Sequence, residues 1–223
     1  DAMRQRVMQS LGQADVNHLR RLIRLCRASE AGGRALLHFG VGPLSWLAGV
    51  AALTASKILD NMEIGHNVMH GQYDWTGDPA LNSQHFDWDI ACDSESWRHS
   101  HNVVHHSYTN ILGKDRDLGY SLLRITPEQR WKPRHLLQPL ANLLLALGFQ
   151  YGVGSHDLEL GRYRHGALAK PVFMERWRRF KAKVGRQWFK DYLLFPALAL
   201  WSAPRVLAGN LLANLLRNLW TYL

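Results

Sequence analysis

The sequence predicts an all-α protein that is integral to a membrane, with cytoplasmic or interfacial helices that carry clustered histidines. Three observations support this fold class. Apolar runs recur along the 223 residues, of which 47% are hydrophobic; two histidine clusters have helical spacing; and a basic, aromatic-rich stretch precedes the last apolar runs. The formal net charge of +9 suits an anionic membrane surface, a nucleic acid or a negatively charged substrate carrier.

The chain begins with a predicted basic amphipathic segment over residues 1–35. Residues 36–56 follow without a charged side chain, and a run of about 20 residues is close to the length that spans a bilayer. Because Pro43 interrupts this run, we expect the helix to begin near Leu44. The same helix is then expected to continue as far as the first histidine cluster.

Further apolar runs cover residues 136–153, 192–201 and 206–223, and the last two form a predicted hairpin around Pro204. Before this hairpin, residues 175–190 have the pattern of a basic amphipathic helix at a membrane interface. Its apolar positions recur every three to four residues: Trp177, Phe180, Val184 and Trp188. Because basic residues favour the cytoplasmic side, we expect a multi-pass protein with this helix and both histidine clusters on that side.

Five histidines carry most of the chemical information. His66 and His70 lie in GHNVMH, and His101, His105 and His106 lie in HNVVHH. Residues four apart share one face of an α-helix, and His106 is expected about 100° further round than His105. In a chain of this composition, HxxxHH arises by chance only about 0.03 times, so the second cluster is specific. Imidazole is the commonest metal-ligating side chain, and the pattern therefore predicts a metal site.

The residues by themselves leave the metal open. A nitrogen-rich donor set without thiolates suits zinc, copper or iron, and the HExxH motif of zinc proteases is absent. Taken alone, the first cluster equally fits two hydrogen-bonded polar residues at a helix end. Six polar side chains near the clusters are candidates to orient the imidazole rings, with ordinary capping and solvation as the alternative: Asp60, Glu63, Asn67, Asn102, Asp115 and Asp117.

The clusters and their surroundings, NMEIGHNVMHGQYDW and WRHSHNVVHHSYTNILGKDRDLGY, resemble the histidine boxes of the membrane-bound fatty acid desaturase family, and bacterial acyl desaturases in particular. The resemblance is most specific over residues 57–120 and implies a desaturase domain over residues 36–223. It implies that two iron ions are bound, that O2 is the co-substrate, and that a double bond is introduced into a fatty acyl chain in lipid metabolism. The iron ligands that it implies are His66, His70, His101, His105 and His106.

This family also has a third histidine box, HxxHH, and none follows His106 in this sequence. The later histidines stand alone, and His156 is the best candidate among them for a further ligand. The sequence is then either a fragment or a degenerate member of the family. Because it also ends inside an apolar run, we interpret it as a desaturase that is truncated before the third box and inactive by itself.

The resemblance implies a substrate chain carried by coenzyme A or by an acyl carrier protein. The absence of nucleotide and haem motifs favours an external electron donor of the ferredoxin or cytochrome type, with an NAD(P)H reductase. In the family the acyl chain lies in a kinked apolar tunnel, which Trp75, Trp88 and Trp97 are placed to line, although membrane-interface positions explain them equally. The alternatives are a hydroxylase on the same scaffold and a non-catalytic basic membrane protein; no nucleic acid is expected as a partner.

Overall fold

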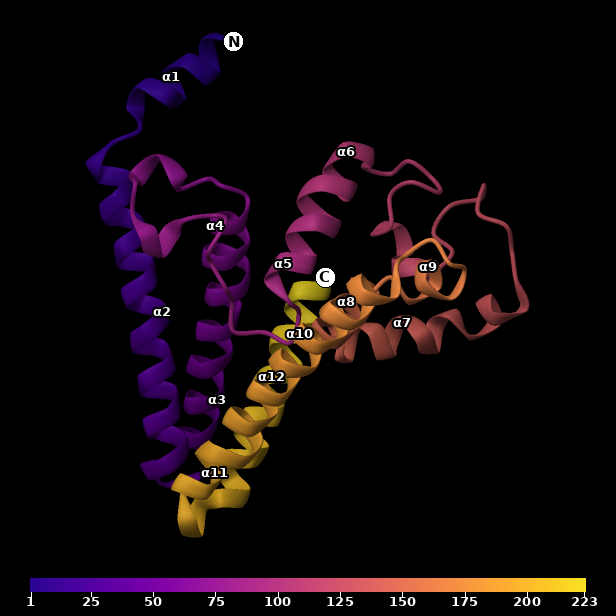
Figure 1. The fold of residues 1–223 in the computed structure, drawn as a ribbon. Coiled ribbons are helices and arrows are strands. Elements are labelled where there is room, and N and C mark those ends of the chain that lie inside the picture. Colours follow the sequence, from indigo (N-terminus) through magenta and orange to yellow (C-terminus); the bar gives the residue numbers. More distant parts are fainter.

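The chain folds entirely into helices and loops, which confirms the predicted all-α class (Figure 1). The computed structural model describes residues 1–223. Helix α1 (Ala2–Ser10) projects away from the body, and α2 (Gln13–Phe39) forms an antiparallel hairpin with α3 (Gly42–Ile58). The π-helix η1 (Leu59–His66) and the short α4 (Asn67–Met69) continue α3, so the predicted run of one helix into the first histidine cluster is confirmed.

Two glycines allow α2 and α3 to pack closely. A Cβ atom on Gly33 would lie 2.8 Å from the backbone nitrogen of Leu53, and one on Gly49 would lie 3.1 Å from the carbonyl oxygen of Gly33. Any side chain at these positions would push the helices apart. The hairpin and α12 enclose an apolar core of Leu37, Val50, Leu53, Ala199, Val206 and Ala213.

The middle of the chain carries the second histidine cluster. Short turns at η2 (Asp74–Thr76) and η3 (Pro79–Leu81) lead to α5 (Ser94–Trp97). The π-helix η4 (Arg98–His105) and α6 (His106–Tyr108) continue α5 as one helical segment. The elements that follow are η5 (Leu118–Ser121), η6 (Pro133–Leu137), α7 (Gln138–Leu147), α8 (Phe149–His156) and α9 (Leu160–Arg164).

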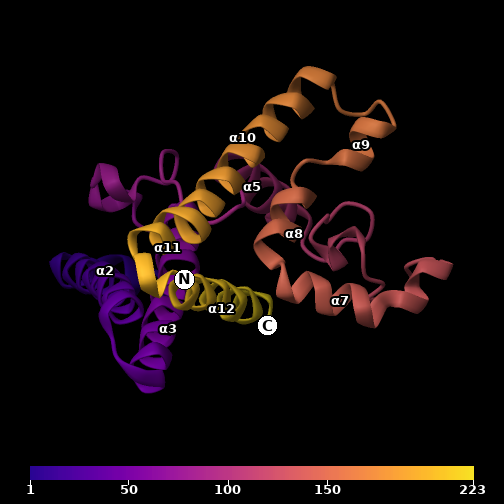
Figure 2. The same ribbon diagram turned by 90° about the horizontal axis from the view of Figure 1, so that it is seen from below.

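The last part of the chain is a helical hairpin. Helix α10 (Lys170–Trp188) continues through the π-helix η7 (Phe189–Leu194) and α11 (Phe195–Leu198) to η8 (Leu200–Ser202), and α12 (Ala203–Tyr222) runs back. Seen from below (Figure 2), α12 lies between the α2–α3 hairpin and α7.

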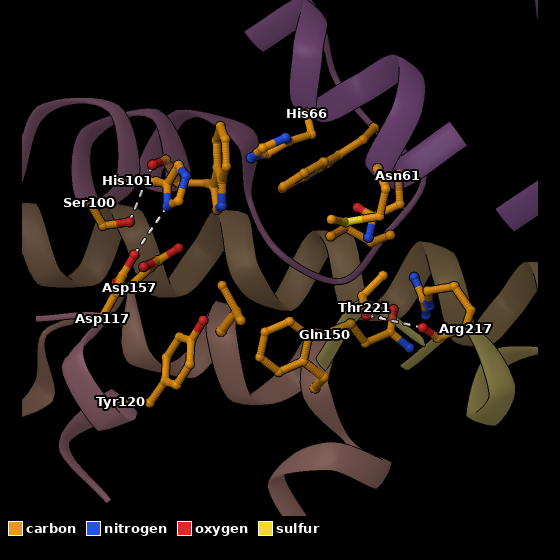
Figure 3. A pocket seen from close by; sticks show the side chains of 16 residues that line it. Asn61, His66, Ser100, His101, Asp117, Tyr120, Gln150, Asp157, Arg217 and Thr221 are labelled. Carbon is orange, nitrogen blue, oxygen red and sulfur yellow. Dashed lines mark hydrogen bonds and ion pairs between the residues drawn. The ribbon is translucent and has the colours of Figure 1, made fainter. Parts of the chain in front are cut away.

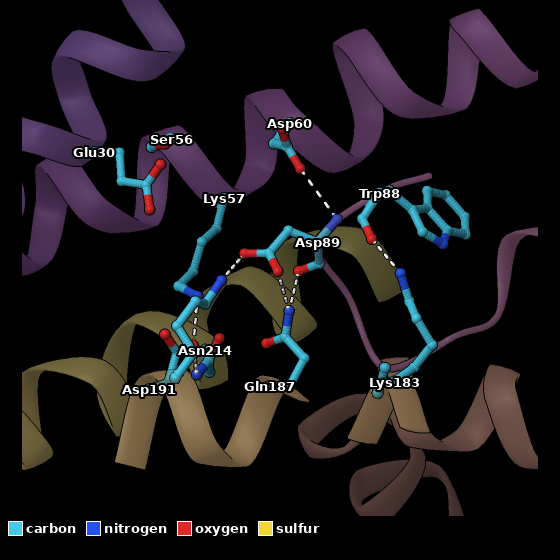
Figure 4. A network of polar contacts seen from close by, with 12 residues as sticks. Glu30, Ser56, Lys57, Asp60, Trp88, Asp89, Lys183, Gln187, Asp191 and Asn214 are labelled. Atoms are coloured by element: carbon cyan, nitrogen blue, oxygen red, sulfur yellow. Dashed lines mark hydrogen bonds and ion pairs between the residues drawn. The ribbon is translucent and has the colours of Figure 1, made fainter. Parts of the chain in front are cut away.

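Helix α10 covers most of the predicted amphipathic stretch, and it packs against the rest of the protein through its polar side. Its fully buried residues are Lys183 and Gln187, whereas Trp188 is 55% exposed. The connection before α5 explains this arrangement, because Lys183 donates to the Trp88 carbonyl oxygen and Gln187 donates to Asp89 Oδ1 at 2.7 Å (Figure 4). Acceptors that lie far away in sequence therefore decide which side of the helix is buried.

One helix, Gly42–Met69, is long and apolar enough to cross a membrane. The pair α7 and α8, bent by 101°, counts as a second candidate if it is a single broken span. The structure thus contains fewer candidate spans than the four predicted apolar runs. Helix α12 illustrates the reason, because its buried residues include polar side chains: Asn210, Asn214, Arg217 and Asn218. Asn214 donates to the Asp191 carboxylate, which also binds Lys57 at 2.8 Å (Figure 4).

Candidate metal centre

The five predicted histidines come together where the α4 end of one helix meets η4 and α6 of the other. Seven pairs of imidazole rings among His66, His70, His101, His105 and His106 have centroids 4.5 to 5.6 Å apart. His99, which belongs to neither motif, is exposed. The two motifs therefore come together in space, although 30 residues lie between His70 and His101.

The second histidine motif lies on a π-helical turn rather than on the expected α-helix, and His106 follows at the start of α6. In the first motif only His66 belongs to a π-helix, because Asn67–Met69 form α4. A π-helix closes i→i+5 hydrogen bonds, so it has roughly 4.4 residues per turn and advances by about 80° per residue. Over five residues, His106 is then turned about 50° away from His101, whereas an α-helix would place it about 140° away. The π-helical turn thus brings three imidazoles of one helix toward the same side.

The first cluster is held mainly by its own two rings and by the neighbouring helix. The Nε2 atoms of His66 and His70 lie 3.1 Å apart and, with a ring nitrogen of His101, form a group whose ligand atoms all lie within 4.8 Å. Asn102 donates its side-chain N–H to the Met69 carbonyl oxygen at 2.7 Å. This bond joins the two histidine-bearing helices directly beside the cluster.

Carboxylates from the loop after α6 hold the second cluster. His101 Nδ1 lies 3.1 Å from Asp117 Oδ2, and His105 Nδ1 lies 3.0 Å from Asp115 Oδ1. Asp115 also accepts the backbone N–H groups of Asn110 and Asp117. Burial alone would raise the pKa of Asp115, but the hydrogen bonds from His105 and these two N–H groups outweigh it and leave the pKa below its usual value.

The carboxylate contacts assign which imidazole nitrogens are free. When Nδ1–H is donated to a carboxylate, the other nitrogen, Nε2, keeps its lone pair for a metal. His101, His105 and Asp117 also form a compact group of potential ligand atoms, but the N–O distance of 3.1 Å identifies the His101–Asp117 contact as a hydrogen bond. Desolvation lowers the pKa of His106, and the neighbouring imidazoles of His101 and His105 lower it further, which favours the neutral form of this ring.

The six predicted orienting side chains have different positions. Only Asp115 and Asp117 contact a histidine of the cluster. Glu63 is exposed, Asp60 accepts the backbone N–H of Asp89 at 3.4 Å, and Asn67 donates to the Glu63 carbonyl oxygen. Asn102 joins the two helices, as described above.

A cavity of about 160 Å³ lies beside the histidines (Figure 3). His66 and His101 form part of its wall; Trp88, Phe149 and Val153 belong to its apolar lining. Trp97 also lines it, whereas Trp75 does not. The polar lining includes Asp117, Tyr120, Asp157 and Arg217. The pattern of the sequence did not single out Asp157, because its neighbours come from segments that lie far away in sequence.

Among the isolated histidines, only His156 approaches this site. Its buried Nε2 lies 3.7 Å from Asp117 Oδ1 and has no hydrogen-bond partner. Its ring also packs edge-on against Tyr120. The contact shows that the end of α8 belongs to the surroundings of the second cluster.

Comparison of the sequence with known proteins finds fatty acid desaturases. The family model described as fatty acid desaturase matches residues 44–223. The NADPH-dependent stearoyl-CoA 9-desaturase of Mycobacterium tuberculosis is 45% identical over 99% of this chain and 53% of its own length. The sn-1 linoleoyl-lipid 6-desaturase of Synechocystis is 33% identical over 37% of this chain and 23% of its own. The chain thus spans about half the length of the mycobacterial relative. No solved structure matches it significantly.

Proposed function

Because this chain belongs to the fatty acid desaturase family, we propose that it carries the histidine centre of an enzyme that introduces a double bond into a fatty acyl chain, with O2 as co-substrate. The observation that carries the proposal is the convergence of five imidazoles from two separate helices beside a partly apolar cavity. Such a set of imidazole nitrogen donors fits a transition metal.

We propose that the metal is a pair of iron ions, as in the family. The ligands would be His66, His70, His101, His105 and His106. The bound metal would supply the activation of O2, which organic side chains do not provide. Asp115 and Asp117 would orient two of the rings and raise their basicity, which strengthens metal binding. Two iron ions offer more coordination positions than five imidazoles fill, so further ligands are proposed to come from outside this chain.

The proposed substrate is a fatty acyl chain carried by coenzyme A or an acyl carrier protein. The mycobacterial relative is named for stearoyl-CoA and NADPH, and its name supports an acyl-CoA substrate. It also supports an external electron donor of the ferredoxin or cytochrome type, which an NAD(P)H reductase would reduce. Trp88, Phe149 and Val153 would pack against methylene groups beside the histidines and exclude water from them.

We further propose that the protein is a multi-pass membrane protein in which residues 36–223 form the desaturase domain and the histidines lie on the cytoplasmic side. The α2–α3 turn and the segment after α11 lie at the end of the molecule opposite α4 and α6 (Figure 1), and exposed apolar side chains at that end support this placement. At the α2–α3 turn, Val41 is 91% exposed and Leu44 is 81% exposed; at η8, Trp201 is 85% exposed. Lipid contact would cover this apolar surface.

The test is product analysis with the full-length protein. Purified protein is analysed for iron and then incubated with stearoyl-CoA, O2 and a reduced ferredoxin system, and the acyl product is measured by mass spectrometry. A loss of two mass units, with about two irons per chain, supports the proposal. A gain of one oxygen would identify a hydroxylase instead, and protein that binds no iron would exclude both enzymes.

A further inference from the structure

Two buried carboxylates follow α8 and have opposite surroundings. Asp157 and Glu159 are each 3% exposed. Glu159 is paired with three guanidinium groups at 2.6 to 3.2 Å, those of Arg116, Arg162 and Arg176. Asp157 has no cationic partner within 4.0 Å, although Arg176 donates to its backbone carbonyl oxygen. The negative charge of Glu159 is therefore compensated by cations, whereas a negative charge on Asp157, two residues earlier, would not be.

Asp157 has a neutral hydrogen-bond partner. Its Oδ2 accepts from Cys92 Sγ at 3.3 Å. The Ser100 hydroxyl lines the same cavity and donates to the Trp97 carbonyl oxygen. Burial raises the pKa of the Cys92 thiol, and the neighbouring Asp157 raises it further, so Cys92 remains a thiol that donates its proton in the hydrogen bond. A buried carboxylate without a cation is costly in its charged form, which favours the protonated acid.

Asp157 also faces the cavity beside the histidines. Its side chain lies on the cavity wall below His101, and His66 lies on the same cavity (Figure 3). Glu159 is not among the lining residues. The carboxyl group that can hold a proton is thus the one with access to the proposed centre.

Desaturation consumes protons, which must reach the cavity beside the histidines. The balanced reaction converts one CH2–CH2 unit, one O2, two electrons and two protons into one CH=CH unit and two waters. Two of the four hydrogens in these waters come from the acyl chain, and two come from solvent. The external donor supplies the electrons. Once a bound acyl chain fills this partly apolar cavity and displaces water, a protein group is needed to deliver the solvent protons.

We propose that Asp157 is this proton donor, an inference that rests on the proposed desaturase function. In each delivery the O–H bond of the carboxyl group breaks, and a new O–H bond forms on an oxygen atom derived from O2. The carboxylate then takes up another proton from solvent. Asp157 requires no contact with the metal for this role.

The experiment compares Asp157→Asn with Glu159→Gln in the full-length enzyme. Asparagine preserves the size of the side chain but has no carboxyl proton to give. For Asp157→Asn we expect desaturation to fall at least about tenfold, with normal iron content, an altered solvent isotope effect in D2O, and more O2 consumed per double bond. Asp157→Glu, which retains a carboxyl group, should recover part of the rate. Glu159→Gln should lower thermal stability but leave the isotope effect and the coupling unchanged.

Three results would overturn the proton-donor role in an active enzyme. The first is Asp157→Asn with the wild-type rate and isotope effect, and the second is a loss of iron in this variant, which would make Asp157 a metal-site residue. The third is Asp157→Glu that is as slow as Asp157→Asn, since the defect would then lie in packing. A wild-type protein that binds iron but forms no double bond would instead overturn the proposed function, and this inference with it.

Discussion

The two histidine motifs share the sequence His-Asn-Val-x-His, yet their surroundings differ. In the second motif, His101 and His105 each bond a carboxylate, at 3.1 and 3.0 Å. In the first motif, the only side-chain hydrogen bond of His66 and His70 joins the two rings to each other. The asparagines differ in the same way, because Asn102 bonds the other helix and Asn67 bonds its own.

The comparison shows that the spacing of the imidazole rings and their orientation have different causes. The motif itself fixes how far apart the imidazoles are along a helix. Their rotation is fixed by groups that the motif does not contain, and only the second motif has such groups in this structure. We infer that the second cluster is oriented before metal binds, whereas the first is oriented largely by the metal.

The largest expected effect is the removal of an imidazole. In the full-length protein, His105→Ala or His106→Ala should reduce desaturation to background and lower the iron content, because a lost ligand cannot be replaced by alanine. Activity is measured by mass spectrometry of the acyl product, and membrane insertion by fractionation, which should be unchanged. His99→Ala is the control, since His99 is exposed and should be dispensable. Full activity of His106→Ala would remove it from the proposed ligands.

A smaller effect is expected from the carboxylates that distinguish the two motifs. Asp117→Asn should weaken iron binding about ten- to hundredfold, because the amide no longer orients and polarises His101 as the carboxylate does. Iron titration of the apoprotein measures this change. Glu63→Gln, next to the first motif, is the matched control and should leave iron affinity unchanged, since Glu63 is exposed. An equal loss of iron affinity in both variants would contradict the inference that carboxylates orient only the second motif.

The sequence predicted the parts of this centre that follow from local patterns. The helical class, the five histidines and the continuation of α3 into the first motif all depend on periodicity over a few turns. The π-helical turns were not predicted, because the same residues fit an α-helical pattern and only the backbone hydrogen bonds distinguish the two.

Features that depend on distant segments were also missed. The burial of Lys183 was not predicted, because the Trp88 carbonyl oxygen to which it donates is 95 residues away. The environment of Asp157 was not predicted either, because its hydrogen-bond donor Cys92 is 65 residues away. The sequence contains these residues, but no periodic pattern indicates which of them meet.

Removal of metal should separate the two motifs further. When a chelator strips the proposed iron from the purified protein, we expect amide hydrogen exchange to increase more over residues 59–70 than over residues 98–108. Without metal, the histidines of the second segment keep their hydrogen bonds to Asp115 and Asp117. The side chains of the histidines in the first segment hydrogen-bond only to each other, so they lose the metal that would hold them. Equal increases in the two segments would show that the carboxylates do not hold the second motif.

The smallest expected effect concerns the bond between the helices. Asn102→Ala leaves the Met69 carbonyl oxygen without its donor at 2.7 Å and should lower the free energy of unfolding by about 1 kcal/mol. Asn67→Ala, at the equivalent position of the first motif, removes only a bond to the Glu63 carbonyl oxygen within its own helix and should be close to neutral. Thermal unfolding in detergent compares the two. If Asn67→Ala destabilised the protein more than Asn102→Ala, the Asn102–Met69 hydrogen bond would not be what joins the two helices. The distance between the two clusters would then have to depend on packing against Trp97, whose ring stacks on His101 and also contacts His66.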